Sequence, residues 1–180
     1  TYPLAGGRLN VVAVQARQGW TDEGWNHADD PANLRAAFAD CAAVIRDMLA
    51  KVEEVRLWGL FRHPVASNWQ TGRAAILGDA AHPTLPFLAQ GANLALEDAY
   101  VLARECNRVP DLGAALTAYE FARQTRVRKA IAAANGNAVN YHLSGISRQV
   151  AHAGLRALGL VAPNQFLKRM DWLYGHDVTA

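Results

Sequence analysis

Residues 76–98 read ILGDAAHPTLPFLAQGANLALED, and they restrict the fold more than any other stretch of this 180-residue chain. A short apolar run ends at Gly78 and Asp79, two prolines follow, and Gly91 then precedes a helical pattern. Proline fixes φ and glycine permits close backbone approach. The stretch therefore predicts a short buried strand, a stiff loop and the start of a helix.

Both ends of this loop carry groups that suit a ligand. Asp79 follows the predicted strand, and in open α/β sheets ligands lie beyond the carboxyl ends of strands. Its carboxylate can accept hydrogen bonds from the hydroxyls of a sugar or polyol. A helix that begins near Gly91 offers unpaired N–H groups and a positive dipole end, which favour an anion or a carbonyl oxygen. The alternative, in which Asp79 only caps a turn and Gly91 only breaks the chain, stays open.

Elsewhere the pattern predicts strands first and helices afterwards. Apolar or alternating runs predict four strands, the first two joined by a turn at Gly6-Gly7: 2–4, 9–16, 54–62 and 74–77. Asp30 and Pro31 are typical of a helix start, and this helix is expected to reach Leu49. Further helices are expected from residue 91 onward, over 116–134, and over 135–180 with breaks. This order favours an α+β or mixed α/β fold.

Three groups of residues have simple structural interpretations. Residues 18–30, with Trp20, Trp25 and His27, predict a polar loop. The apolar face of the helix after residue 91 is expected to comprise Ala92, Leu96, Ala99, Ala103 and Cys106. The basic residues Arg123, Arg126, Arg128 and Lys129 are expected to form a solvated helix face, because acidic residues lie nearby.

Composition excludes several classes of function. The net charge of +2 gives no support to nucleic-acid or membrane-surface binding. No run of about 18 apolar residues predicts a membrane span, and the first residues lack the order of a signal peptide. Cys41 and Cys106 are too few and too distant for a disulfide framework or metal site. A cytoplasmic protein is expected, and because the chain opens without Met we expect a part of a longer protein.

The stretch GDAAHPTLPFLAQGANLALEDA closely resembles the second flavin-binding motif of the class A FAD-dependent aromatic hydroxylases, most of all the salicylate hydroxylase and 3-hydroxybenzoate 6-hydroxylase branch. The opening YPLAGGRLNVVAV resembles the sheet of that family's substrate domain. A weaker W-x-x-G-R spacing at Trp69, Gly72 and Arg73 also fits. The resemblance covers about residues 1–130 and is most specific over 72–99.

This resemblance implies roles for particular residues. Asp79 would bind the ribityl chain of FAD, and Pro86 would lie beside the flavin on the face where oxygen and substrate react. Gln90 would lie near the cofactor, and the pyrimidine edge of the ring would contact Gly91, Ala92 and Asn93. His82 could act as a general base, although a histidine that orders the turn is the better interpretation. Apolar walls near the ring are expected from Leu85, Phe87 and Leu88.

The family's activity is hydroxylation of a phenolic or aromatic acid with NAD(P)H and O₂. The chain lacks the family's G-x-G-x-x-G motif for the ADP half of FAD. We therefore expect the C-terminal half of such an enzyme, with part of the substrate-domain sheet over 1–70, the second flavin motif over 71–110 and helices over 111–180. Alone it should bind FAD weakly and be inactive, and it could associate with the missing half or with itself. Two alternatives are a non-catalytic module and a flavin monooxygenase of ubiquinone precursors or polycyclic compounds.

Overall fold

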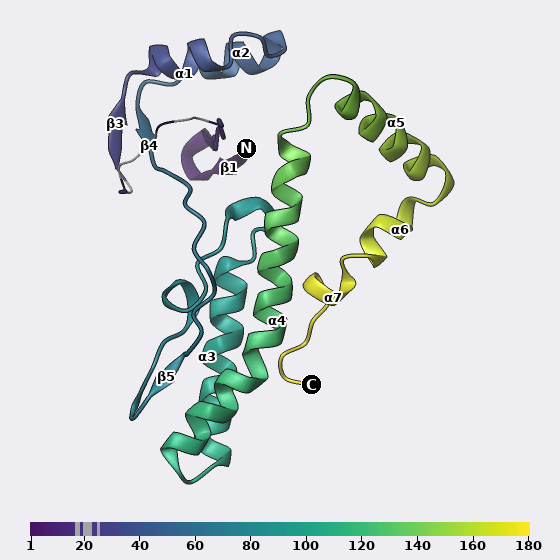
Figure 1. Ribbon diagram of the computed structural model, residues 1–180. Coiled ribbons are helices and arrows are strands. Elements are labelled where there is room, and N and C mark those ends of the chain that lie inside the picture. The colour runs from purple at the N-terminus through teal and green to yellow at the C-terminus, as the bar shows by residue number, and fades with distance from the viewer. Residues whose placement is uncertain (17–18, 20–22, 25) are drawn as a thin grey trace. The chain divides into compact units, whose positions relative to one another are not determined.

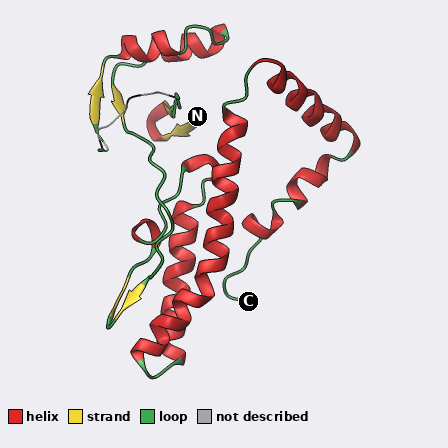
Figure 2. Ribbon diagram, viewed as in Figure 1, coloured by secondary structure: helices red, strands yellow, loops and turns green. Residues whose placement is uncertain are grey.

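The structure is a computed structural model that describes residues 1–180 except 17–18, 20–22 and 25 (Figure 1). Its contacts divide the chain into two compact units, Thr1–Leu60 and Phe61–Ala180. The described residues form mainly helices, together with small antiparallel two-stranded sheets (Figure 2). The mixed fold class is thus correct at this coarse level, with more helix than sheet.

The first unit opens with a hairpin. Strands β1 (Tyr2–Leu4) and β2 (Arg8–Asn10) pair antiparallel, and Gly6 and Gly7 turn the chain with φ of 74° and 70°. Only glycine adopts such angles readily, so the predicted glycine turn is confirmed. The second strand is shorter than the predicted 9–16, because pairing ends where β1 ends, and residues 11–16 have no regular structure.

The same unit contains a second strand pair, with two short helices between its strands in sequence. Strands β3 (His27–Asp29) and β4 (Val55–Leu57) pair antiparallel, and they are separated by α1 (Pro31–Ala37) and α2 (Ala43–Leu49). The Asp30 cap is confirmed, since its carboxylate accepts a bond from Ala32 N at 2.7 Å.

Three predictions for this unit need correction. The helix expected over 31–49 is broken, because Phe38 leaves helical geometry and its N–H bonds to Ala36 O. The loop expected over 18–30 contains β3, while Trp20 and Trp25 lie outside the described residues. The strand expected over 54–62 is only β4, since pairing stops where β3 begins.

The second unit is a hairpin followed by helices. Strands β5 (Gln70–Thr71) and β6 (Ala74–Ala75) pair antiparallel, and two 3₁₀ turns follow at η2 (Gly78–Ala80) and η3 (Pro86–Leu88). The helices are α3 (Gly91–Arg108), α4 (Leu112–Tyr141), α5 (Gly145–Val161), α6 (Pro163–Lys168) and α7 (Asp171–Tyr174). The predicted helical content is confirmed. The strand expected over 74–77 is shorter and not fully buried, with Ile76 and Leu77 37% and 36% exposed.

The core of this unit lies between α3 and α4, which run side by side in Figure 1. Its members include Trp69, Leu94, Val101, Tyr119, Val127, Ile131 and Leu173. The face of α3 that enters the core comprises Leu94, Asp98, Val101 and Glu105. The face predicted from Ala92, Leu96, Ala99, Ala103 and Cys106 is exposed instead. The helix itself was therefore predicted correctly, but the side of α3 expected to be buried was wrong.

The basic residues of α4 also differ from expectation. Arg123 is only 2% exposed and Arg126 only 12%, so neither belongs to a solvated face. Arg128 and Lys129 are exposed, as predicted, and the Lys129 ammonium lies 4.1 Å from the ring centre of Trp172. Among the helices that the structure describes, none combines the length and the apolar character needed to cross a membrane.

Candidate functional site

The candidate site is the turn between β6 and α3. It begins at Gly78, where φ is 57° and an added Cβ would lie 3.0 Å from the Cβ of Ala95. The Gly78 N–H donates to Asp98 Oδ2 at 3.0 Å. A side chain would be strained there and would collide with α3. Glycine thus lets the chain pass close to α3 before it enters the loop.

Asp79 lies beside the start of α3. A Cβ added to Gly91 would lie 3.9 Å from Asp79 Oδ1 and 3.1 Å from the Thr84 methyl carbon. Asp79 is exposed, and none of the described residues donates a hydrogen bond to its carboxylate. The carboxylate and the helix start, twelve positions apart in sequence, are therefore neighbours, and the carboxylate is free to accept bonds from a ligand.

The first turn of α3 has unpaired amides. The first residue whose N–H bonds into the helix is Leu94, which donates to Gln90 O at 2.9 Å, and no side chain caps the helix. The amides of Gly91, Ala92 and Asn93 have no acceptor among the described residues. Ala92 and Asn93 are exposed. Such amides, at the positive end of an 18-residue helix, form a binding surface for an anion or carbonyl oxygen.

The middle of the loop exposes Pro86 and buries its neighbours. Pro86 opens η3 and is exposed, while Leu85 and Leu88 are only 9% and 7% exposed. Gln90 is 6% exposed, so its side chain lies mostly inside. The expected apolar walls at Leu85 and Leu88 are thus parts of the protein interior. Pro86, like Ala89, is therefore open to contact with a molecule from outside.

Two distant helices hold this loop in place. Asn137 on α4 donates from Nδ2 to Phe87 O at 2.9 Å, and the Tyr174 hydroxyl on α7 donates to Leu88 O at 3.1 Å. The Phe87 ring also lies 5.2 Å from that of Tyr141, centre to centre. These anchors were not predicted, because nothing in a sequence shows which distant side chain reaches a given carbonyl.

His82 lies inside the protein, in a buried ionic cluster. It is 1% exposed, its Nε2 lies 2.5 Å from Asp98 Oδ2, and Arg123 Nε donates to Asp98 Oδ1 at 2.7 Å. Because a carboxylate only accepts, Nε2 carries a proton, and in the neutral ring Nδ1 is an acceptor. That Nδ1 is buried and has no partner among the described residues. The Trp69 ring lies 5.2 Å from the imidazole.

The electrostatics of this cluster keep Asp98 ionised. Burial by itself would raise the pKa of Asp98, but hydrogen bonds from His82, the Gly78 amide and Arg123 outweigh it and lower the pKa. The same charge field acts on Tyr119, whose pKa is raised by burial and by the nearby Asp98 carboxylate. Asp98 was not among the predicted site residues, and Arg123 was expected on a solvated helix face rather than in this buried cluster.

The cluster extends from the loop to the C-terminal segment. Glu97 binds Arg123 and Arg126, both at 2.7 Å. Arg126 donates in turn to the carbonyls of Trp172 and Leu173, at 3.0 and 3.2 Å. Burial would raise the pKa of Glu97, but its bonds to Arg126 and Arg123 lower it. A continuous set of ion pairs and hydrogen bonds therefore links the loop, α3, α4 and α7.

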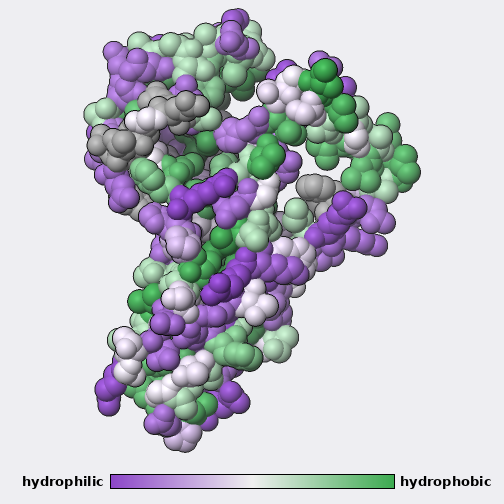
Figure 3. Space-filling view, viewed as in Figure 1, coloured by the Kyte–Doolittle hydropathy of each residue, from purple (hydrophilic) through white to green (hydrophobic). Residues whose placement is uncertain are grey.

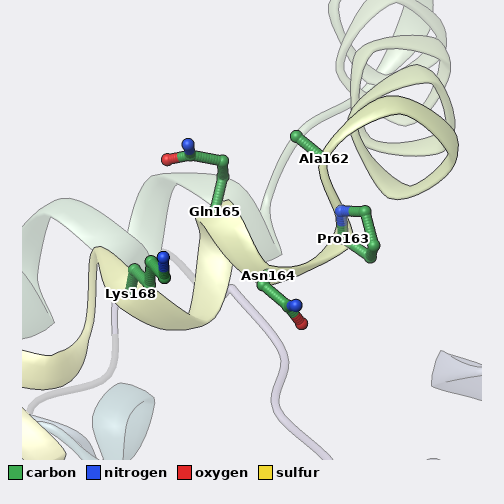
Figure 4. A pocket seen from close by; sticks show the side chains of 5 residues that line it. All are labelled: Ala162, Pro163, Asn164, Gln165 and Lys168. Carbon is green, nitrogen blue, oxygen red and sulfur yellow. The ribbon is translucent and has the colours of Figure 1, made fainter.

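The chemistry of its exposed groups defines this site. A hollow of about 200 Å³ is lined by Ala162, Pro163, Asn164, Gln165 and Lys168, where α5 meets α6 (Figure 4). It contains none of the candidate residues. At the loop, an exposed carboxylate and unpaired amides lie beside Gly91, where an added Cβ would be 3.9 Å from Asp79 Oδ1, and these groups fit a ligand with hydroxyls and an electron-rich carbonyl edge. FAD has both groups, so the residues present fit it.

Comparison with known proteins agrees with this chemistry. The family described as "FAD binding domain" matches residues 2–134. The chain is 37% identical to the 3-amino-4-hydroxybenzoate 2-monooxygenase PtmB3 of Streptomyces platensis, over 98% of this chain and 44% of that protein. It is 33% identical to 3-hydroxybenzoate 6-hydroxylase 2 of Aquipseudomonas alcaligenes, over 98% of this chain and 55% of the relative.

A solved structure resembles the chain as well. It is a variant of HpxO from Klebsiella pneumoniae complexed with FAD, with a TM-score of 0.62 and 28% identity over 79% of this chain and 39% of that one. The chain spans about half the length of the curated relatives it matches. It is therefore related to FAD-dependent aromatic hydroxylases over part of their length.

Proposed function

Since this chain belongs to the FAD-binding domain family, we propose that it supplies the second flavin-binding segment of an aromatic hydroxylase and part of its substrate site. The substrate class would be a small phenolic or aromatic acid, as the names of its relatives state for those proteins. The observation that carries the proposal is the exposed, unbonded Asp79 carboxylate beside the three unpaired amides of α3.

Each of these groups would have a separate role. Asp79 would accept hydrogen bonds from the ribityl hydroxyls of FAD, while the amides of Gly91, Ala92 and Asn93 would donate to the pyrimidine edge of the flavin. Pro86 would lie against the ring, where its rigid, apolar surface excludes water. When bound, FAD would supply the redox chemistry between NAD(P)H, O₂ and the aromatic substrate. The start of α3 would stabilise negative charge that develops on the ring edge.

His82 would position the turn, since its Nε2 is already committed to the buried Asp98. If His82 were instead a general base, its other nitrogen, Nδ1, would accept the proton. That nitrogen is buried, and the Trp69 ring lies beside the imidazole, so a positioning role agrees better with the geometry.

The activity can be tested on the full-length gene product. With FAD bound, NAD(P)H oxidation should be stimulated by 3-hydroxybenzoate or by an amino-hydroxybenzoate, and the product should gain one oxygen atom. Stimulation only by ubiquinone precursors or polycyclic phenols would change the substrate class. A protein without flavin or turnover would favour a non-catalytic module.

The site can be tested separately with Asp79→Asn. In the full-length protein this variant should bind FAD about tenfold or more weakly than the unmodified protein, because a charged acceptor is replaced by a neutral one. Asp47→Asn, an exposed acid on α2, serves as the matched control and should bind FAD as the unmodified protein does. Flavin titration followed by fluorescence quenching measures both. Equal affinities in the two variants would remove Asp79 from the site.

A further inference from the structure

The second unit buries an acid while it leaves apolar side chains at the surface. Helix α5 exposes Ile146, Leu160 and Val161 by 80% or more, and green side chains cover it in Figure 3. Asp98, in contrast, is 0% exposed and lies on the face of α3 that enters the core. Replacing a buried ionic group and its partners by well-packed apolar residues is often neutral or stabilising. Stability alone therefore does not explain an acid at position 98.

Three residues on one side of α3 lie beside the turn that contains Asp79. Gly91, Ala95 and Asp98 are four and three positions apart, which makes them neighbours on one side of a helix. Asp98 Oδ2 accepts from the Gly78 amide at 3.0 Å, and a Cβ added to Gly78 would lie 3.0 Å from Ala95 Cβ. A Cβ added to Gly91 would lie 3.9 Å from Asp79 Oδ1. The turn thus runs along this side of α3, from Asp98 toward the helix start.

The same carboxylate holds both ends of that turn. Asp98 Oδ2 also lies 2.5 Å from His82 Nε2, and the His82 amide donates to Gly78 O at 2.9 Å. Asp79 therefore lies within a closed turn whose first and last residues are bound to Asp98. The other oxygen of Asp98 accepts from Arg123 Nε at 2.7 Å, which fixes the carboxylate itself.

This arrangement sets the distance between the two groups of the candidate site. The unpaired amides at the start of α3 belong to the same helix as Asp98, which lies seven positions after Gly91, or about 10 Å along the axis. The turn that carries Asp79 is bound to that helix through Asp98. The length of the Asp98 side chain therefore determines how far the Asp79 carboxylate lies from the amides.

We propose that Asp98 is a positioning residue, which sets the separation of the Asp79 carboxylate and the α3 amides so that one ligand can bind to both. This inference rests on the proposed function, in which the ribityl chain of the flavin binds Asp79 and its ring binds the amides. Asp98 is buried and would contact neither part. A change in its length should therefore weaken binding of a ligand that carries both parts, and should have little effect on the ring alone.

Two flavins without the ADP half separate these parts. Riboflavin contains the ring and the ribityl chain, whereas lumiflavin has a methyl group in place of that chain. The full-length gene product, freed of FAD, should bind riboflavin about tenfold or more tightly than lumiflavin, since only riboflavin can bind Asp79. Asp98→Glu keeps the charge but lengthens the side chain by one methylene, so it should remove most of this preference. Titration followed by flavin fluorescence measures each affinity.

Two further variants separate positioning from general damage. Ala95→Val adds bulk between the turn and α3 without altering a buried charge, so it should reduce the riboflavin preference as Asp98→Glu does. Glu105→Asp is the matched control, because it changes another buried acid of α3 by one methylene. Glu105 bonds to Arg104 and Arg108 rather than to the turn, so the preference should stay. Circular dichroism checks that each variant folds.

A double variant tests whether Asp98 acts through Asp79. Asp79→Asn alone should abolish the preference for riboflavin. Addition of Asp98→Glu should weaken riboflavin binding no further, because a residue that acts through the Asp79 carboxylate then has nothing left to position. Independent, additive losses in the double variant would overturn the proposal.

The ratio of the two affinities distinguishes the possible roles, because a purely structural role of Asp98 would weaken riboflavin and lumiflavin binding equally. If Asp98→Glu folds and keeps the ratio while Asp79→Asn loses it, the positioning role alone is removed. Ala95→Val decides in the same way where Asp98→Glu does not fold. A ratio near one in the unmodified protein, or a preference that survives Asp79→Asn, contradicts the proposed role of Asp79 and this inference with it.

Discussion

Asp98 is the residue on which the loop depends most. Its carboxylate accepts hydrogen bonds from the Gly78 amide, His82 Nε2 and Arg123 Nε, so it joins both ends of the turn to α4. Burying this charge is costly, and the cost is offset only while all three donors are present. Asp79, which directly follows Gly78, differs in that its carboxylate is exposed and has no donor among the described residues. It is therefore available to a ligand.

Asp98→Asn should lower the free energy of unfolding by about 3–5 kcal/mol, because it removes one of the two carboxylates that neutralise the buried Arg123 guanidinium, the other being Glu97. Asp79→Asn is the matched control and should change it by less than about 0.5 kcal/mol, since no described residue bonds to that carboxylate. Denaturant unfolding followed by circular dichroism measures both. A loss below about 1 kcal/mol for Asp98→Asn would show that the cluster contributes little.

The same cluster predicts how stability depends on pH. The pKa values of Asp98 and Glu97 are lowered in the folded protein, so the unfolded chain binds protons first as the pH falls. Their contribution should be fully present above about pH 5 and should decline below about pH 4, where free carboxylates titrate. Unfolding measured from pH 7 to pH 3 should show this decline, and Asp98→Asn should show a shallower one. An equally steep decline in the variant would contradict the assignment.

At this scale the sequence predicted the exposed groups better than the buried ones. Asp79 and Gly91 could be singled out as candidate residues because an acid after an apolar run and a glycine before a helix have specific physical meanings, and their roles stay a prediction. Arg123 and Arg126 were misplaced, because a sequence shows that acids are nearby but not that Glu97 and Asp98 on another helix neutralise them inside the protein.

At the scale of elements, the loop is fixed by helices that come later in the chain. Helix α4 reaches it through Asn137, and α7 reaches it through Tyr174. Helix α7 is itself held by Arg126 and by Leu173, which is 2% exposed in the core. The short C-terminal helix thus acts as a brace for the proposed flavin loop.

Tyr174→Phe tests this brace. Removal of the hydroxyl should cost about 0.5–1.5 kcal/mol and speed amide exchange around η3, because the Leu88 carbonyl loses its donor. Tyr2→Phe, an exposed tyrosine in the other unit, should leave exchange at η3 unchanged. Hydrogen exchange read by mass spectrometry compares the two. Unchanged exchange at η3 in Tyr174→Phe would show that α7 does not support the loop.

Helices were easier to predict than strands. The amphipathic or alanine-rich runs of α3 and α4 specify their own hydrogen bonds, so the sequence located both. A strand exists only where a partner pairs with it. The run 9–16 therefore becomes a three-residue strand when β1 supplies only three partners, and 54–62 shrinks to match β3.

At the scale of the whole molecule, the chain corresponds to about half of each curated relative and matches the FAD-binding domain family over residues 2–134. The Gly-rich motif for the ADP half of FAD is absent from its sequence. The family could be recognised from one loop because that loop combines a carboxylate, prolines and a glycine at fixed positions.

Amide hydrogen exchange on the full-length protein, with and without FAD, tests the central claim most directly. The account predicts that FAD slows exchange at Gly91, Ala92 and Asn93 by about tenfold or more, because these amides become donors to the ligand. The start of α5 is the matched control, since Ser144 provides no side-chain cap and its first amides are equally unpaired, and exchange there should not change. Stoichiometric FAD binding that leaves exchange at the start of α3 unaltered would contradict the account.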